Sequence, residues 1–565
     1  MRRGRPLTKL VVAAAAVVLA ASACIGRDGG SAIETSESPR LASNRGGTLS
    51  LLMSADFAHL DPARNYDATS LNFGRLLYRT LTTYKAERGR AGSDVVGDLA
   101  TDTGTPSAGG KTWTFTLRDG LKYEDGTAIK AEDVKYGIER AFDPELPGGP
   151  QYFQLSLANV PAGYAGPKKA GGKGLDSIVV AGRSITFELK KPFPDFSFAA
   201  AMPTSAPVPR TKDTGTAYDQ RPFSSGPYKV ARYDRGKILT LTRNAFWDAK
   251  TDVVRRAYPD HIVCTFGVEP STIDQRLIAD SGQDRSALAF DTTLAPESIP
   301  QALSSPAVKS RTISGLDGYL LYLAINTRRV KDTRVRQAIN YAVNKESYRT
   351  ARGGKYAGEY ASTILTPLVP GYREYDLYKA PPRGDAEKAK QLLQQAGVQL
   401  PLRLTMASPS IGKGVTQAVA VQAALERAGI EVSIQPISPE MYLDTLGTAA
   451  KMPDLAFSNR GADWPSGSTV LPPLFDGRQI KARGNSNISL LNIPAINAEM
   501  DRINAIADPQ KQAPEWGKLD QLIMKEAPIV PLIYNAGIHL RGSQVRGSYL
   551  HAYYGQWDLV SLSVR

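Results

Sequence analysis

The side chains most often used in catalysis and metal binding are scarce in this sequence. The 565 residues include four histidines and two cysteines, and the histidines lie far apart, at His59, His261, His539 and His551. Nucleophilic catalysis and zinc binding usually need such residues in close groups. The chain contains no G-x-S-x-G, H-E-x-x-H, P-loop or C-x-x-C motif. We therefore expect no enzyme activity, no bound metal and no cofactor, and a structural or surface role for each histidine. The alternative is a metal site or a histidine-dependent triad, because residues far apart in sequence can meet in a fold.

Cys24 directly follows a segment with the composition of an export signal. This segment has a basic start and then an apolar run over residues 10–23 that ends in small residues. This arrangement resembles the signal of bacterial lipoproteins, although an alanine stands where a leucine is usual. We expect residues 1–23 to be a signal peptide, Cys24 to be lipidated, and residues 24–46 to be a flexible, lipid-anchored tether. The alternative is ordinary secretory cleavage before Cys24, which leaves a free thiol.

The second cysteine, Cys264, lies in the apolar stretch HIVCTFG. This setting predicts a buried strand residue, with a catalytic thiol as the alternative. If Cys24 is lipidated, Cys264 has no partner within the chain for a disulfide.

The net charge of +14 is spread along the chain. Four of the positive residues fall in the expected signal peptide, and the remainder form no Lys/Arg run of the kind that binds nucleic acid. We therefore expect no nucleic-acid partner and interpret the charge as favouring solubility beside an anionic cell envelope.

Local patterns indicate alternating strands and helices. Residues 112–141 predict a strand, a turn and an amphipathic helix, and residues 224–247 predict a hairpin. Residues 318–327 read as a strand covered on both faces, followed by a helix that Asp332 caps. Residues 385–437 contain a βαβ crossover and so predict a parallel sheet. The length predicts two or three α/β domains.

Four segments, in this order along the chain, resemble family 5 extracellular solute-binding proteins, which are the oligopeptide- and dipeptide-binding components of bacterial ABC importers. The segments are SADFAHLDPARNYD (54–67), LRDGLKYEDGTAIKAEDVKYGIER (117–140), SGPYKVARYDRGKILTLTRNAFW (225–247) and YLAINTRRVKDTRVRQAINYAVNKESY (322–348). The segment SYLHAYYGQWD (548–558) matches no pattern of that family.

The resemblance implies an α/β, periplasmic-binding-protein-like fold: two α/β lobes with a hinge and a ligand cleft, plus an additional smaller α/β domain. Lobe I would comprise residues 47–80, 205–316 and 530–565. The additional domain would be residues 81–204 and lobe II residues 317–529, with the hinge near positions 316 and 530.

The resemblance also implies a function. The chain would be an extracellular substrate-binding lipoprotein of an ABC transporter, capturing peptides in the interlobe cleft and delivering them to a membrane permease. It would be a monomer on the extracytoplasmic face of the cell membrane. Two alternatives remain: the same fold binding an oligosaccharide, a metal chelate or an opine-like compound, and a secreted hydrolase, against which the missing catalytic motifs count.

The resemblance assigns the ligand anchor to the segment DLAFSNRGADWPSGSTVLPPLF (454–475). In similar family segments an aspartate holds the α-ammonium group of a bound peptide, and here that residue is Asp463, with Trp464 as an aromatic wall beside it. Arg460 stands where the family has a tryptophan, and its guanidinium suits the carboxylate of a short or acidic ligand. The alternative is a surface turn in which Asp463 caps local N–H groups.

Overall fold

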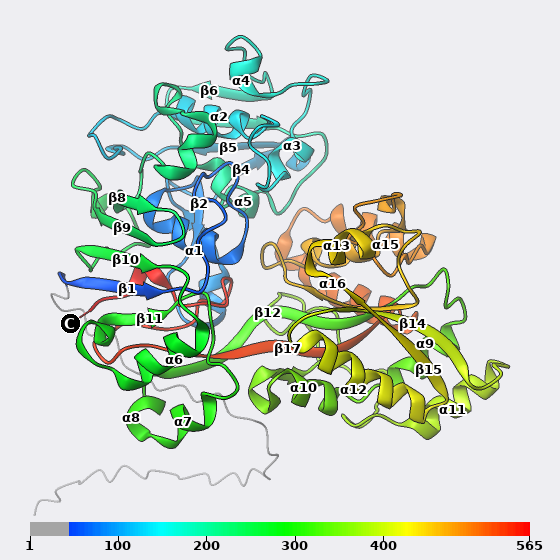
Figure 1. The fold of residues 1–565 in the computed structure, drawn as a ribbon. Coiled ribbons are helices and arrows are strands. Elements are labelled where there is room, and N and C mark those ends of the chain that lie inside the picture. The colour runs from blue at the N-terminus through cyan, green and yellow to red at the C-terminus, as the bar shows by residue number, and fades with distance from the viewer. Residues whose placement is uncertain (1–44, 565) are drawn as a thin grey trace, which may run out of the picture. The chain divides into compact units, whose positions relative to one another are not determined.

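The computed structural model describes residues 45–564, which form a mixed α/β fold with four β-sheets (Figure 1). The expected signal peptide, Cys24 and almost all of the expected tether lie outside the described residues. Within the described part, no helix combines the length and the apolar character that a membrane crossing requires.

A five-stranded sheet has the strand order β11-β1-β10-β9-β8. Its strands are β1 (Thr48–Leu52), β8 (Tyr228–Asp234), β9 (Ile238–Arg243), β10 (His261–Thr265) and β11 (Ala287–Ala289). The predicted hairpin is confirmed, since β8 and β9 pair antiparallel across a turn in which Gly236 adopts φ +70°. Cys264 is a fully buried residue of β10, as predicted.

Helices and the C-terminal segment cover this sheet. The helices nearby in the chain are α1 (Ala68–Leu77), α6 (Pro270–Ala279), α7 (Ile299–Ser304) and α8 (Pro306–Lys309). The apolar core of the sheet includes Phe73 of α1 and, from the opposite end of the chain, Trp557 and Val560. The C-terminal residues are therefore an integral part of this core.

A four-stranded antiparallel sheet, β4-β5-β7-β6, forms a separate core. Its elements are β4 (Thr105–Ser107), β5 (Thr112–Thr116), β6 (Ile178–Ala181), β7 (Ser184–Glu188), α2 (Ala131–Arg140), α3 (Tyr152–Ser156), α4 (Gly166–Lys169) and α5 (Phe196–Ala199), with the pair β2 (Thr82–Tyr84) and β3 (Val95–Gly97) nearby in the chain. The strand and helix predicted within residues 112–141 are confirmed as β5 and α2. Trp113 and Phe115 of β5 pack in one core with Val134 and Ile138 of α2.

A six-stranded sheet has the order β13-β17-β12-β16-β14-β15. Its strands are β12 (Thr312–Ile325), β13 (Gly358–Tyr360), β14 (Leu402–Pro409), β15 (Ile430–Ile437), β16 (Leu455–Arg460) and β17 (Ile529–Leu540). Its helices are α9 (Thr333–Ala342), α10 (Lys345–Arg352), α11 (Ala386–Gln395), α12 (Lys413–Arg427), α13 (Pro439–Gly447), α14 (Leu471–Phe475), α15 (Pro494–Asn504) and α16 (Pro509–Lys525). The predicted βαβ unit is confirmed, because β14 and β15 are parallel and α12 connects them. Asp332 caps α9 as expected, accepting from the Arg334 N–H at 2.8 Å.

Strands β12 and β17 extend beyond the six-stranded sheet toward the five-stranded sheet (Figure 1). They pair antiparallel along most of their length, with a register shift between Leu316 and Leu320. β12 begins earlier than the predicted strand because residues 312–316 pair with residues 536–540. The segment between the two paired regions, Asp317-Gly318-Tyr319, enters the cleft described next. The exact division into lobes and an additional domain stays a prediction.

Candidate ligand-binding site

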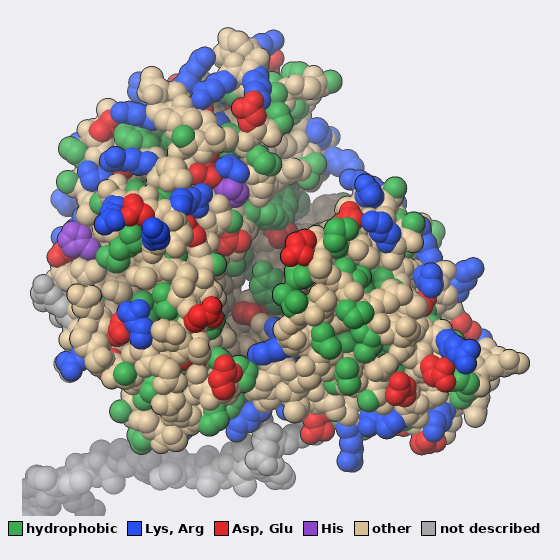
Figure 2. Space-filling model, in the orientation of Figure 1, with side chains coloured by type: hydrophobic (Ala, Val, Ile, Leu, Met, Phe, Trp, Pro, Cys, Tyr) green, Lys and Arg blue, Asp and Glu red, His purple; other side chains and the backbone are tan. Residues whose placement is uncertain are grey.

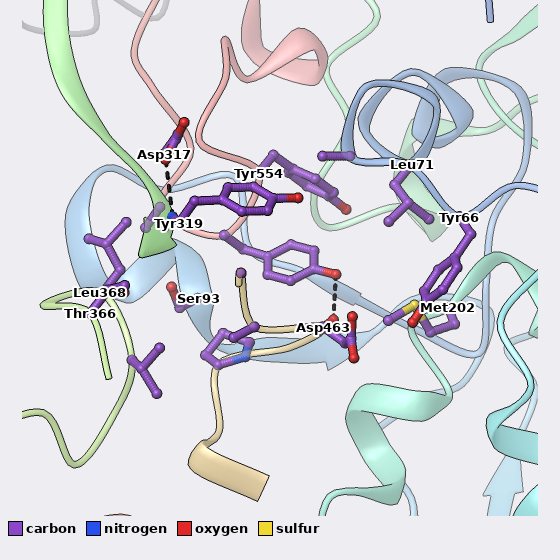
Figure 3. A pocket seen from close by; sticks show the side chains of 18 residues that line it. Tyr66, Leu71, Ser93, Met202, Asp317, Tyr319, Thr366, Leu368, Asp463 and Tyr554 are labelled. Atoms are coloured by element: carbon purple, nitrogen blue, oxygen red, sulfur yellow. Dashed lines mark hydrogen bonds between the residues drawn. The ribbon is translucent and has the colours of Figure 1, made fainter. Parts of the chain in front are cut away.

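A hollow separates the six-stranded sheet and its helices from the rest of the described chain (Figure 2). Its first chamber encloses about 690 Å³ of space, part of it open to solvent. Four tyrosines line it, Tyr66, Tyr319, Tyr553 and Tyr554 (Figure 3). The charged side chains in its lining are both acidic, Asp317 and Asp463. This composition suits a ligand that carries a cationic group and some apolar surface.

Asp463 lies in the loop that follows β16, and two donors reach the same carboxylate oxygen, Oδ2. The Tyr152 hydroxyl donates to it at 2.6 Å and Nη2 of Arg460 at 2.9 Å. The Asp463 and Arg460 side chains are only 19% and 21% exposed. Burial and the charge of Asp463 raise the pKa of the nearby Tyr66 to about 12, so this phenol is a neutral donor at pH 7. The structure thus brings Asp463 and Arg460 together as an ion pair.

Arg460 is held from a second side, because Nη2 also donates to the Thr469 carbonyl. Its Nε is buried without a hydrogen-bond partner among the described residues. Arg460 is not among the residues that line the first chamber. The ion pair lowers the net charge that Asp463 presents to a ligand.

Trp464 is not among the residues that line the first chamber, and it is 2% exposed. Its Nε1–H donates to Oδ2 of Asp195 at 3.0 Å, and the Ser468 hydroxyl donates to the same oxygen at 2.5 Å. The ring of Tyr152 packs edge-on against its indole, with the centroids 4.4 Å apart. Trp464 therefore fixes the loop that carries Asp463, and its predicted role as a ligand wall stays a prediction.

The C-terminal segment 548–558, which matched no family pattern, supplies one wall of the chamber. Tyr553 stacks on Tyr84 with the ring centroids 4.0 Å apart, and its hydroxyl donates to the Asp463 carbonyl at 2.7 Å. Tyr554 packs against Tyr553 edge-on. Sequence reasoning missed these residues and Tyr152. The paired tyrosines in HAYYG were the available signal, since aromatic pairs are common in binding surfaces.

A second chamber adjoins the first and encloses about 1130 Å³, part of it open to solvent. The two share Ala68, Asp317, Tyr319 and Tyr554 in their linings. Basic residues are absent from the described lining of the first chamber, whereas the second contains Arg352 and Lys413. The second chamber therefore differs from the first in having cationic side chains beside its acidic residues, Asp291 and Asp317.

The histidines take structural positions. His539 and His551 are buried, and burial lowers the pKa of each to about 4. His59 is half-buried, and its Nδ1 lies 2.7 Å from Oδ2 of Asp219. His261 is exposed at the surface. Among residues 45–564, no group of three or more His, Cys, Asp or Glu side chains is placed to hold a metal ion.

Comparisons with known proteins place this cleft in context. A solved structure, "Clavulanic acid biosynthesis oligopeptide binding protein 2", is 35% identical and superposes with a TM-score of 0.87, over 93% of this chain and 96% of that one. "Di/tripeptide-binding protein 2" of Pseudomonas aeruginosa (strain UCBPP-PA14) is 27% identical over 68% of this chain and 71% of its own length. "Probable deoxycholate-binding periplasmic protein YgiS" of Escherichia coli (strain K12) is 25% identical over 78% and 81%, respectively.

A family model also matches a large part of the chain. Residues 94–482 match "Bacterial extracellular solute-binding proteins, family 5 Middle", which is more than half of the chain. The fold agrees with the periplasmic-binding-protein-like architecture that the sequence predicted. The chain therefore belongs to family 5 of the bacterial extracellular solute-binding proteins.

Proposed function

We propose that this protein captures short peptides in the cleft and delivers them to the permease of an ABC importer. The observation that carries the proposal is Asp463, a partly buried carboxylate in a chamber walled by tyrosines. Family 5 proteins are binding proteins rather than enzymes, which fits the missing catalytic motifs. Two of the similar proteins are named for binding oligopeptides or di- and tripeptides.

The proposed contact is between Asp463 and the α-ammonium group of the peptide. Both protein donors use Oδ2, so the ammonium would bind through Oδ1. Expulsion of water by a ligand strengthens such a charge-assisted hydrogen bond. The tyrosine rings would pack against the peptide and add cation–π attraction to the amine.

A second candidate is a solute other than a peptide, bound in the same cleft. The Arg460–Asp463 ion pair favours this candidate, because an aspartate whose charge is balanced by an arginine attracts an amine less strongly. One similar protein is named for binding deoxycholate, which has no amine.

The rest of the proposal concerns place and assembly. We propose lipidation at Cys24, anchoring on the extracytoplasmic face of the cell membrane, and a monomer that meets its permease there. Lobe I (47–80, 205–316 and 530–565) and lobe II (317–529) would close about β12 and β17, with residues 81–204 packed as the additional domain.

The test combines ligand identification with one substitution. Native mass spectrometry of protein purified from its own host identifies a retained solute, and calorimetry then measures the affinity of wild type and Asp463→Asn for it. For a peptide we expect Asp463→Asn to lose about 2–5 kcal/mol of binding free energy with an unchanged melting temperature. Asp444→Asn is the matched control, since Asp444 pairs with Lys451 on the exposed surface, outside both chambers. Equal affinity in wild type and Asp463→Asn would refute the amine anchor.

A further inference from the structure

Asp463 already has a counter-ion within the protein. Nη2 of Arg460 lies 2.9 Å from its Oδ2, and among residues 45–564 no other basic side chain forms an ion pair with Asp463. Both side chains are mostly buried, with exposed fractions of 21% for Arg460 and 19% for Asp463. Water and salt screen charges only weakly in such a setting, so the guanidinium and the carboxylate largely balance each other.

The fold holds Arg460 in this position independently of any solute. Arg460 is the last residue of β16, where its backbone pairs with β12 of the six-stranded sheet. Its Nη2 also donates to the Thr469 carbonyl. The chain between Arg460 and Asp463 passes so close to Tyr319 that a Cβ atom on Gly461 would lie 2.9 Å from the ring. The ion pair is therefore a fixed part of the structure around the cleft.

A solute in the first chamber meets the carboxylate and not the guanidinium. Asp463 lines this chamber, whereas Arg460 does not. The Arg460 guanidinium and the Tyr152 hydroxyl both donate to Oδ2, which leaves Oδ1 for the solute. Arg460 consequently acts on a solute through the positive charge that it places beside Asp463.

The other polar side chains close to Asp463 are neutral. Four tyrosines lie near its carboxylate: Tyr66, Tyr152, Tyr319 and Tyr553. Burial raises the pKa of each phenol, and the charge of Asp463 adds to the shift. These hydroxyls therefore stay uncharged at pH 7, and the balancing charge comes from Arg460.

This pairing changes the free energy of closing the cleft over a solute. A lone carboxylate that a solute without an amine cuts off from water is an uncompensated buried charge, which is strongly unfavourable. With Arg460 beside it, Asp463 keeps a partner whether or not the solute carries an amine. An amine at Oδ1 is attracted to Asp463 but repelled by Arg460, because two cations on one carboxylate lie only about 5–6 Å apart.

We propose that Arg460 allows the cleft to bind solutes with or without a free amine, so that short peptides with a blocked N-terminus belong to its substrate class. The inference rests on the proposed function and extends it. Asp463 contacts an α-ammonium group where the solute has one, but capture does not require the amine. Arg460 is then a selectivity-determining residue that acts through Asp463, and an uncharged side chain in its place makes the amine a strict requirement.

Calorimetry on the full chain with two probes tests this inference. The probes are trialanine and N-acetyl-trialanine, which differ in the charge of the N-terminus. In the wild type we expect trialanine to bind less than about tenfold tighter than the acetylated probe. In Arg460→Gln this ratio should become at least about ten times larger, because the acetylated probe leaves Asp463 unpaired and the amine is no longer repelled. Arg460→Lys keeps the positive charge and should restore a ratio close to that of the wild type.

Two control variants separate the charge of Arg460 from its structural contacts. Tyr152→Phe removes the other donor to Oδ2 without removing a charge, so the affinities for the two probes should change in parallel. Arg403→Gln makes the same substitution at an exposed arginine of the same sheet, paired with Glu431 and outside both chambers, and should alter neither affinity. If Arg460→Gln has a lowered melting temperature, Arg460→Met, which keeps a long apolar chain, takes its place.

The contrary outcomes distinguish this inference from the proposed function. A wild-type ratio above about tenfold overturns the inference. A ratio that does not rise when Arg460 becomes neutral also overturns it, since loss of the contact with Thr469 alone weakens both probes in parallel. The amine anchor is tested separately by Asp463→Asn, which should weaken trialanine more than its acetylated form. Equal affinity of wild type and Asp463→Asn for trialanine refutes the anchor, and if the wild type binds neither probe, both proposals fail.

Discussion

The loop that carries Asp463 depends on a buried aspartate from a distant part of the chain. Asp195 is 2% exposed, and its Oδ2 accepts from Nε1 of Trp464 at 3.0 Å and from Oγ of Ser468 at 2.5 Å. Its other oxygen, Oδ1, has no partner among the described residues. The two donated hydrogen bonds are therefore the whole of its stabilisation by side chains, and losing one leaves a poorly compensated buried charge.

We predict that Trp464→Phe weakens ligand binding although it changes no residue that lines the first chamber. A hydrogen bond to a charged group contributes about 1.5–3 kcal/mol. If its loss frees the loop, the dissociation constant of an amine ligand should rise about 10- to 100-fold. The ring packing against Tyr152 is largely kept, so the fold should persist. Calorimetry with the ligand identified from the wild type measures the change.

Trp516→Phe provides a matched control. Trp516 is fully buried, but its Nε1 has no hydrogen-bond partner among the described residues. This substitution removes the same atoms from the same protein without removing a hydrogen bond to an acid. If Trp464→Phe binds ligand as tightly as wild type, or if Trp516→Phe weakens binding equally, Asp195 does not position the Asp463 loop. A double-mutant cycle of Trp464→Phe with Asp195→Asn should show strong coupling between the two sites.

Three further outcomes follow from the same geometry. Tyr553→Phe removes the hydrogen bond to the Asp463 carbonyl and should weaken binding about fivefold with an unchanged melting temperature; calorimetry with no difference would contradict this. Burial and the charge of Arg75 lower the pKa of His551 in the folded protein to about 4. As the pH falls, His551 is therefore protonated in the unfolded state before it is protonated in the folded state. Its contribution to the free energy of unfolding is full above about pH 6.5 and declines by about 1 kcal/mol per pH unit toward pH 4. Urea titrations should show a shallower acid slope for His551→Gln than for wild type, and identical slopes would refute the assignment. Asp558→Asn breaks a fully buried pair with Arg75 at 2.6 Å and should cost about 3–5 kcal/mol of unfolding free energy in the same titrations, so a loss below about 1 kcal/mol would contradict the buried-pair interpretation.

The elements that could be predicted from the sequence are those with local causes. The alternation in residues 112–116, the turn at Gly236 and the helix cap at Asp332 each depend on neighbours a few positions away, and each is confirmed. The first part of β12 was missed because Ser314 and Gly315 are poor strand formers on their own. Pairing with β17, more than two hundred residues later, overrides that local preference.

The candidate site was harder to predict because its contacts join distant parts of the chain. The family resemblance led to Asp463, but nothing near Asp463 in sequence indicates Tyr152, which is 311 positions away, or Tyr553, which is 90 away. Asp195 is likewise 269 positions from Trp464. Such contacts follow from the way the sheets are placed, which no local pattern encodes.

The charges that line the cleft predict which solutes it would accept. Asp317 and Asp463 line the first chamber, and the second is lined by Arg352 and Lys413 together with Asp291 and Asp317. Tyr319 and Tyr554 belong to both linings. A bound solute with no acidic group would leave Arg352 and Lys413 without a counter-charge, whereas Asp463 keeps Arg460 as its partner with any solute. Desolvating an unpaired charge is more costly than misplacing an apolar side chain. We therefore expect the charge of a solute to affect its binding more than the size of its apolar side chains.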